Sequence, residues 1–211
     1  MNYIIIPVTP YQQNCSLIWC DETRKAAFID PGGEAEKLIS ELQARDLVLE
    51  KVLLTHGHLD HVGAAKEIAD QFNVPIVGPR IEDKFWFRQL PMQAQMFNFP
   101  HLDSFLPTHW LEPDENQSVG NITLETRHCP GHTPGHIVFY NAASKLAFVG
   151  DVLFSGSVGR SDFPQGNHNT LINSIKTQLL PLGDEVEFVP GHGPNSTFGH
   201  ERLHNPFLQP N

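Results

Sequence analysis

The chain has 211 residues, of which 40% are hydrophobic, and a formal net charge of −10 at pH 7. This length and composition suit a single domain, residues 1–211, with a substantial core. The acidic balance argues against a nucleic-acid partner, because phosphate binding needs clustered Lys and Arg. The N-terminus lacks the pattern of a signal peptide and no apolar run reaches membrane-spanning length, so we expect a cytoplasmic protein that binds no membrane.

The first half of the chain predicts three short strands, a helix and a buried strand: residues 2–9, 14–20, 25–30, 34–46 and 49–55. The three opening strands form a meander that ends at "DPGG". The helix is amphipathic, with Leu38, Ile39 and Leu42 on one face. The strand after it has an almost continuous run of apolar residues, which indicates burial on both faces.

A histidine cluster, "THGHLDH" at residues 55–61, directly follows that strand, and residues 62–72 predict a helix after it. Residues 79–118 then carry many aromatic side chains among several prolines. We interpret this stretch as a helical insert. Its aromatic residues are expected to pack against the core, and a lid over a substrate is the alternative.

The second half repeats the alternation of strands and helices, with strands at 122–130, 136–141, 145–151 and 185–194 and a helix at 169–180. Sheets that each bury one face must pack against another layer. The sequence therefore predicts an α/β fold in which two β-sheets pack face to face with helices outside, an αββα sandwich.

The histidine cluster has the residue types and spacing of metal ligands. Alternate residues on extended backbone project to one side, so His56 and His58 can bind one ion. Asp60 and His61 are neighbours and are expected to diverge, so one ion is not expected to hold all four groups. Two ions are implied.

Further ligands are expected where strands end at glycine-rich turns, in "CPGHTPGH", "FVGD" and "VPGHGP". These turns supply His132, Asp151 and His192. Glycines let the backbone turn sharply there, so that a short side chain reaches inward; they are Gly131, Gly135, Gly150, Gly191 and Gly193. Imidazole and carboxylate ligands suit zinc and also iron or manganese.

The order His56-x-His58-x-Asp60-His61, then His132, Asp151 and His192, resembles the metallo-β-lactamase superfamily. Within it, "HCPGHTPGH" and "GDVLFSGSVGRSDFPQGN" resemble hydroxyacylglutathione hydrolases of the short bacterial type II glyoxalase branch. The resemblance implies two divalent ions, most simply zinc. It places His56, His58 and His132 on one ion, Asp60, His61 and His192 on the other, and Asp151 between them, with Asp60 and Asp151 as catalytic carboxylates.

The implied activity is hydrolysis of a glutathione thioester such as S-lactoylglutathione, giving a hydroxy acid and glutathione, as in methylglyoxal detoxification. Two ions on the order of 3.5–4 Å apart can share a water and lower its pKa toward ~7, so that hydroxide attacks the thioester carbonyl. The thiolate then leaves without a strong general acid. The chain is not expected to carry the C-terminal helical domain that binds glutathione in longer relatives.

Arg160 is the residue expected to bind the substrate. A chain with a net charge of −10 repels an anionic tripeptide, so binding needs a local cation near the metals. In glutathione-binding relatives the corresponding positions carry Lys and Tyr, whereas here they carry Arg160 and Asp162. The alternative for Arg160 is a structural loop arginine that pairs with Asp162.

Other functions remain as alternatives. "GRSDF", residues 159–163, is similar to persulfide dioxygenases, which use one iron held by two His and one Asp. A lactonase, an RNA-processing nuclease and a non-catalytic module are less well supported, and Asp151 replaces the Cys ligand of well-known zinc β-lactamases. His136 is expected to pack behind the ligands and His128 to lie at the surface.

The three cysteines, Cys15, Cys20 and Cys129, cannot all pair, and we expect reduced thiols. Cys129 precedes a ligand-bearing turn but has no base of its own. A structural role is therefore expected for it rather than nucleophilic catalysis.

Overall fold

The computed structural model describes residues 1–209 and contains two mixed β-sheets. The first has the strand order β1-β2-β3-β4-β5, with β1 (Asn2–Val8), β2 (Gln13–Trp19), β3 (Lys25–Ile29), β4 (Val48–Leu53) and β5 (Ile76–Val77). The second has the order β13-β12-β9-β8-β7-β6, with β6 (Gln117–Val119), β7 (Ile122–His128), β8 (Ile137–Asn141), β9 (Leu146–Gly150), β12 (Glu187–Pro190) and β13 (Ser196–Thr197). A small hairpin, β10 (Leu153–Phe154) with β11 (Ser157–Val158), follows β9.

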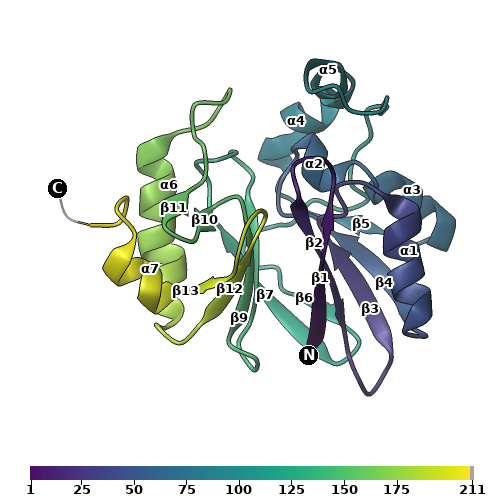
Figure 1. The fold of residues 1–211 in the computed structure, drawn as a ribbon, viewed down its shortest axis with the longest axis horizontal. Coiled ribbons are helices and arrows are strands. Elements are labelled where there is room, and N and C mark those ends of the chain that lie inside the picture. Colours follow the sequence, from purple (N-terminus) through teal and green to yellow (C-terminus); the bar gives the residue numbers. More distant parts are fainter. Residues whose placement is uncertain (210–211) are drawn as a thin grey trace.

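Helices cover the outer faces of both sheets, as Figure 1 shows. On one side α1 (Ala35–Ala44) and α3 (Ala65–Phe72) cover the outer face of the first sheet. On the other lie α6 (His168–Ser174), which continues as a π-helical segment to Leu179, and α7 (Phe198–His204). The short helices α2 (Leu59–Val62), α4 (Lys84–Arg88) and α5 (Leu90–Met96) lie at the edge where the strands of the first sheet end.

Three buried clusters hold these layers together. One packs α1 and α3 on the first sheet through side chains such as Phe28 and Leu38. A second packs α6 and α7 on the other sheet, and a third fills the space between the sheets with side chains such as Phe139 and Phe148. Two sheets with helices on both outer faces are the predicted αββα sandwich, which is confirmed.

Five strands of the two sheets end where the candidate site lies. β3 and β4 pair in parallel, as do β9 and β12, and β7 runs in the same direction as β9 because both are antiparallel to β8. The histidine cluster follows β4, and the other three predicted ligand positions follow β7, β9 and β12. The turns after these strands therefore gather side chains far apart in the sequence.

Several predicted boundaries are wrong in detail. The helix predicted at 62–72 is two helices, α2 and α3, so that Asp60 and His61 lie inside α2 rather than beside a helix. The insert predicted at 79–118 ends earlier, because Gln117–Val119 joins the second sheet as β6. The β10–β11 hairpin, β13 and α7 were not anticipated. The three strands have two residues each, which is too short to show an alternating pattern. In the described part of the chain, none of the helices has the length and hydrophobicity needed to span a membrane.

Candidate metal centre

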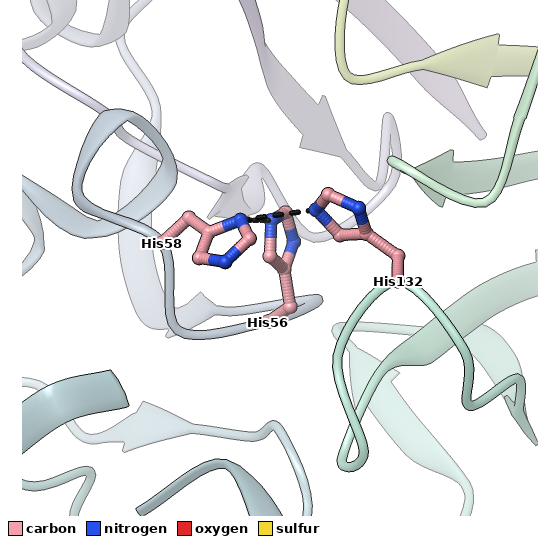
Figure 2. A group of neighbouring side chains, drawn as sticks. All are labelled: His56, His58 and His132. Atoms are coloured by element: carbon pink, nitrogen blue, oxygen red, sulfur yellow. Dashed lines mark hydrogen bonds between the residues drawn. The ribbon is translucent and has the colours of Figure 1, made fainter. Parts of the chain in front are cut away.

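Three histidines from two turns direct ring nitrogens toward one another. His56 and His58 leave the turn after β4, and His132 leaves the turn between β7 and β8. His56 Nε2 lies 3.2 Å and His132 Nε2 lies 3.0 Å from His58 Nδ1 (Figure 2). All three side chains are buried. The structure therefore brings together the three histidines that were expected to share one ion.

The opposite nitrogens of two of these rings are already hydrogen bonded. His132 Nδ1 donates to the carbonyl oxygen of Arg160 at 2.6 Å, and His56 Nδ1 lies 3.0 Å from the hydroxyl of Thr55. A ring that donates from Nδ1 keeps a lone pair on Nε2, which is the form that binds a metal. The surroundings of His56 and His132 thus select the ligand tautomer.

A second group combines Asp60 and His61 of α2 with His192, which follows β12. His192 Nε2 lies 3.2 Å and His61 Nε2 lies 3.9 Å from Asp60 Oδ2. The expectation that Asp60 and His61 diverge is wrong. Consecutive helical side chains project about 100° apart, which leaves both atoms within reach of one ion. Two ions stay a prediction, because this group has three ligand residues of its own beside those of the first group.

Asp151 lies between the two groups. Its Oδ2 is 3.6 Å from His132 Nε2 and 3.9 Å from His192 Nε2, and its Oδ1 is 3.4 Å from His61 Nε2. The carboxylate thus reaches ligand atoms of both groups from its position immediately after β9. This placement is what a residue that bridges two ions requires.

Burial and charge make the two groups electrostatically different. Burial lowers the pKa values of His56, His58 and His132, so these rings are neutral. Burial also lowers the pKa of His61, but the carboxylates of Asp151 and Asp60 outweigh it and raise that pKa well above its usual value. The first group is ready to bind a cation, and the second lies in a negative field that favours one.

The residues present fit a pair of metal ions. In the part of the chain that the structure describes, His61 Nε2 and Asp151 Oδ1 are buried without a hydrogen-bond partner. Leaving such atoms unsatisfied costs about 1–3 kcal/mol each, so a pair of them facing one another indicates a missing partner. Neutral imidazoles and carboxylates of this kind suit a divalent cation.

Asp30, which follows β3, was missed by the sequence interpretation. Its carboxylate accepts from His61 Nδ1 at 2.9 Å and from the Thr55 hydroxyl at 2.5 Å, and Thr55 in turn contacts His56. Asp30 therefore orients a histidine of each group. It also lies near His56 and His61 as a possible ligand, but these bonds already occupy it. An acid at a strand end before "PGG" is the same signal that pointed to Asp151.

Asp83 was also missed, although it connects the insert to two of the ligand turns. This fully buried carboxylate accepts from the backbone N–H of Gly57 at 3.0 Å, the hydroxyl of Thr133 at 2.8 Å and the N–H of Gly135 at 2.5 Å. Gly57 separates His56 from His58, and Thr133 follows His132. Asp83 thus holds both turns of the first group in place.

The glycines of the ligand turns act in two ways. Gly150 has φ of +49°, which lets the chain turn immediately before Asp151. Gly191 leaves space, because a Cβ there would lie 2.1 Å from Asp151 Oδ1. The predicted sharp turn is confirmed at Gly150, whereas Gly191 is needed for space and not for its backbone conformation.

The remaining histidines and the cysteines lie outside the two groups. His136 is buried, stacks on His56 at 4.7 Å and accepts from the backbone N–H of Asp151 at 3.2 Å, as expected of a packing residue. His128 is half-buried and donates to the carbonyl of Pro134, so it lies only partly at the surface. Cys15, Cys20 and Cys129 are buried free thiols, and burial raises the pKa of Cys129, which favours the structural role.

Arg160 borders the cavity above the ligand groups, but its charge is already paired. Its guanidinium donates from Nε and from one terminal nitrogen to Asp162, and it lies 4.2 Å from the ring centroid of Phe163. The pairing with Asp162 is the structural alternative considered from the sequence. The side chain is 62% exposed, so a substrate can still reach it.

Replacing Asp83 with alanine should destabilise the fold and weaken metal binding by the first group. Three buried donors lose their acceptor, which should lower the free energy of unfolding by about 3 kcal/mol or more. Denaturant unfolding and metal titration measure the two effects. Glu82→Ala is the matched control, because this neighbouring acid is exposed and pairs only with Arg80. Equal stability of the two variants would contradict the role given to Asp83.

Comparison with known proteins places the chain in a family. Residues 8–199 match the Metallo-beta-lactamase superfamily. The chain is 54% identical to hydroxyacylglutathione hydrolase GloC of Haemophilus influenzae, over 99% of this chain and 98% of that protein. Two solved structures are also similar. The BLEG-1 B3 metallo-beta-lactamase has a TM-score of 0.92 at 34% identity, over 99% of this chain and 100% of that chain. TTHA1623 in a di-iron-bound form has a TM-score of 0.88 at 36% identity, over 97% of this chain and 100% of that chain. The chain therefore belongs to the metallo-β-lactamase superfamily.

Proposed function

We propose that the protein is a metal-dependent hydrolase of glutathione thioesters of the S-lactoylglutathione kind. The observation that carries the proposal is the 54% identity, over nearly the whole of both chains, to the hydroxyacylglutathione hydrolase of Haemophilus influenzae. The geometry supports it, because Asp151 lies between two groups of ligand atoms at the floor of one cavity. The reaction adds water across the C–S bond and yields a hydroxy acid and glutathione.

The proposed ligands divide as the geometry groups them. His56, His58 and His132 would hold one divalent ion; Asp60, His61 and His192 would hold the other; and Asp151 would contact both. When bound, such ions supply an activated water near neutral pH and polarise a carbonyl. Zinc is the first choice for these ligands, with iron and manganese as alternatives, and the di-iron form of TTHA1623 supports testing iron.

The chain's own residues fix where this chemistry takes place. Asp30 and the carbonyl of Arg160 keep His61 and His132 in the ligand tautomer, so that the ligand atoms need no rearrangement. Asp60 and Asp151 provide the negative charge that offsets the ions. A thiolate is a good leaving group, so the proposed reaction does not require a general acid from the protein.

A persulfide dioxygenase remains the second candidate, because "GRSDF" at residues 159–163 is similar to that group. Such an enzyme uses one iron and consumes oxygen. The second ligand group, with His192 Nε2 3.2 Å from Asp60 Oδ2, favours the two-metal reading.

Metal analysis and two activity assays on one purified sample test the proposal. We expect about two metal ions per chain and hydrolysis of S-lactoylglutathione, followed by the loss of absorbance of the thioester bond. One iron per chain with persulfide-dependent oxygen uptake and no hydrolysis would reverse the assignment. Hydrolysis of a β-lactam is measured on the same sample, because the chain is similar to the BLEG-1 metallo-beta-lactamase.

Replacing Asp151 with alanine should remove at least one ion and nearly all hydrolysis. The carboxylate sets both the spacing and the charge of the proposed pair, so neither group retains its full set of ligands without it. Metal content per chain and kcat measure the effect. Asp103→Ala is the control, because this acid is almost fully exposed, does not line the cavity and belongs to neither ligand group. Full metal content with normal turnover would exclude the bridging role.

His136 and His132 should respond differently to replacement by glutamine. His136 accepts a hydrogen bond from the Asp151 backbone but points no nitrogen into either group, so His136→Gln should keep the metal content. His132→Gln removes a proposed ligand and should lower both metal content and activity. If both variants lose metal equally, the ligand of this turn is wrongly assigned.

Replacing Arg160 with alanine should raise KM for a glutathione thioester roughly tenfold, with kcat less affected. The proposed contact is remote from the reacting carbonyl and acts equally in the ground and transition states. A simple thioester that lacks the peptide should be hydrolysed poorly by both proteins and change little. Arg202→Ala is the control, because Arg202 pairs with Asp184 as Arg160 pairs with Asp162. An unchanged KM, or equal damage with both substrates, would make Arg160 structural.

A further inference from the structure

The cavity above the ligand groups is far more apolar than its floor. It has a volume of about 510 Å³, and five of the seven proposed ligands line its floor: His58, Asp60, His132, Asp151 and His192. Its walls carry large apolar side chains from the loop after β1, from α4, from α5 and the residues after it, from β10 and from the loop after β11: Tyr11, Trp86, Met92, Met96, Phe97, Phe99, Phe154 and Phe163. Neither the metals nor the hydrolysis of a small polar acyl group accounts for so much apolar surface.

Many of these side chains are exposed where burial would be expected. Met96 is 68% exposed, Tyr11 and Met92 are each 49% exposed, and Phe97 is 42% exposed. Within residues 1–209, four of the nine exposed large hydrophobic side chains border this one cavity. A concentration of apolar surface beside a polar centre is typical of a site that binds an apolar ligand.

The aromatic residues form two separate walls, one beside each ligand group. Trp86 and Phe163 stand edge-on to His58, with ring centroids 4.4 Å and 5.1 Å away, and Arg160 lies over Phe163. On the other side Tyr11 stacks on Phe99 at 5.5 Å. The carbonyl of Tyr11 accepts from His192 Nδ1 at 3.1 Å, which fixes this second wall to the second ligand group.

A thioester has two arms that diverge from its carbonyl carbon. With the carbonyl at the proposed metals, one arm can lie along each wall. The anionic peptide arm is matched by the wall that carries Arg160, the one Lys or Arg side chain among the described residues that line the cavity. The acyl arm is then left with the apolar lining away from Arg160, and we assign to it Tyr11, Phe99 and the exposed methionines of α5.

We propose that the wall formed by Tyr11, Met92, Met96 and Phe99 binds an apolar acyl group, so that thioesters of alkyl- and aryl-substituted hydroxy acids are better substrates than the lactoyl thioester. This inference rests on the proposed function and deepens it by naming the acyl class. Methionine side chains are flexible and polarisable, so two of them on α5 suit acyl groups of varied shape rather than one.

The expected gain grows with the apolar area that the acyl group buries. A buried methylene group improves kcat/KM roughly fourfold when it is buried in the transition state. A phenyl or butyl substituent in place of the lactoyl methyl should therefore raise kcat/KM by about tenfold or more. The reaction itself is unchanged, since water adds to the same carbonyl and the same thiolate leaves.

Three glutathione thioesters test the inference, carrying lactoyl, 2-hydroxyhexanoyl and phenyl-substituted hydroxyacetyl groups. The wild-type protein should prefer the two apolar acyl groups. The double variant Met92→Gln/Met96→Gln keeps side-chain length and helix propensity on α5. It should reduce the selectivity ratio, kcat/KM of the phenyl substrate over that of the lactoyl substrate, by at least fivefold.

Leu203→Gln is the matched control. Leu203 is 68% exposed, as is Met96, but it lies on α7, which does not contribute to the cavity. This variant should keep the wild-type ratio. A ratio near one in the wild-type protein, or a ratio that the methionine changes leave intact, would overturn the inference while leaving thioester hydrolysis established.

Binding of the free acids provides a readout independent of turnover. Calorimetry on the metal-loaded protein should show tighter binding of the phenyl-substituted hydroxy acid than of lactate, by about tenfold, and a smaller difference in the double variant. If no thioester is hydrolysed but this preference holds, the proposed function fails and the apolar wall stands. The preference for the thiol arm is measured as kcat/KM of a glutathione thioester over that of a thioester that lacks the peptide. If the methionine changes alter this ratio instead, the two arms are reversed and the assignment is wrong.

Discussion

The convergence of buried imidazole and carboxylate atoms on a small volume is the constraint on which the rest of the structure depends. His61 Nε2 faces Asp151 Oδ1 at 3.4 Å, and neither atom has a hydrogen-bond partner among the described residues. Such an arrangement is unfavourable for a protein alone and becomes favourable when a cation is shared. Folding must therefore bring these atoms together despite the free-energy cost of removing them from water. A rigid backbone around the site is needed to hold them there. Strand ends from two packed sheets provide that support.

The support comes from residues that do not themselves need to touch a metal. Asp30 orients His61 directly and His56 through Thr55, and its own position is set by the parallel pairing of β3 with β4. Asp83 supports the first group through the backbone and neighbouring side chains, because it accepts hydrogen bonds from both of its ligand-bearing turns. A ligand atom held in this way loses little freedom on binding an ion, so the outer residues contribute to affinity without being ligands.

Much of this could be predicted from the sequence, because the signals are local. Seven residues carry the histidine cluster, and the other ligands stand beside glycines at strand ends such as "FVGD". Asp83 could not be found in this way. It lies 26 residues after Gly57 and 50 before Thr133, so only the folded chain shows that its carboxylate meets both. The exposure of Met96 was equally hidden, since a methionine on a short helix is normally expected to face the core.

The insert, which lies between the two sheets in the sequence, combines the two roles considered for it, packing against the core and contact with a substrate. Its first part is anchored in the interior, with Asp83 and Phe87 fully buried, and this part packs and braces the ligand turns. In its second part, α5, Met92 and Met96 are exposed and line the cavity, whereas Gln93 is buried and accepts from the backbone N–H of Leu59 at 3.0 Å. Changes in the second part alter the cavity wall without disturbing the hydrogen bonds that Asp83 makes. Because the bracing side chains, Asp83 and Gln93, differ from the exposed methionines, the proposed acyl wall can vary while the ligand geometry stays fixed.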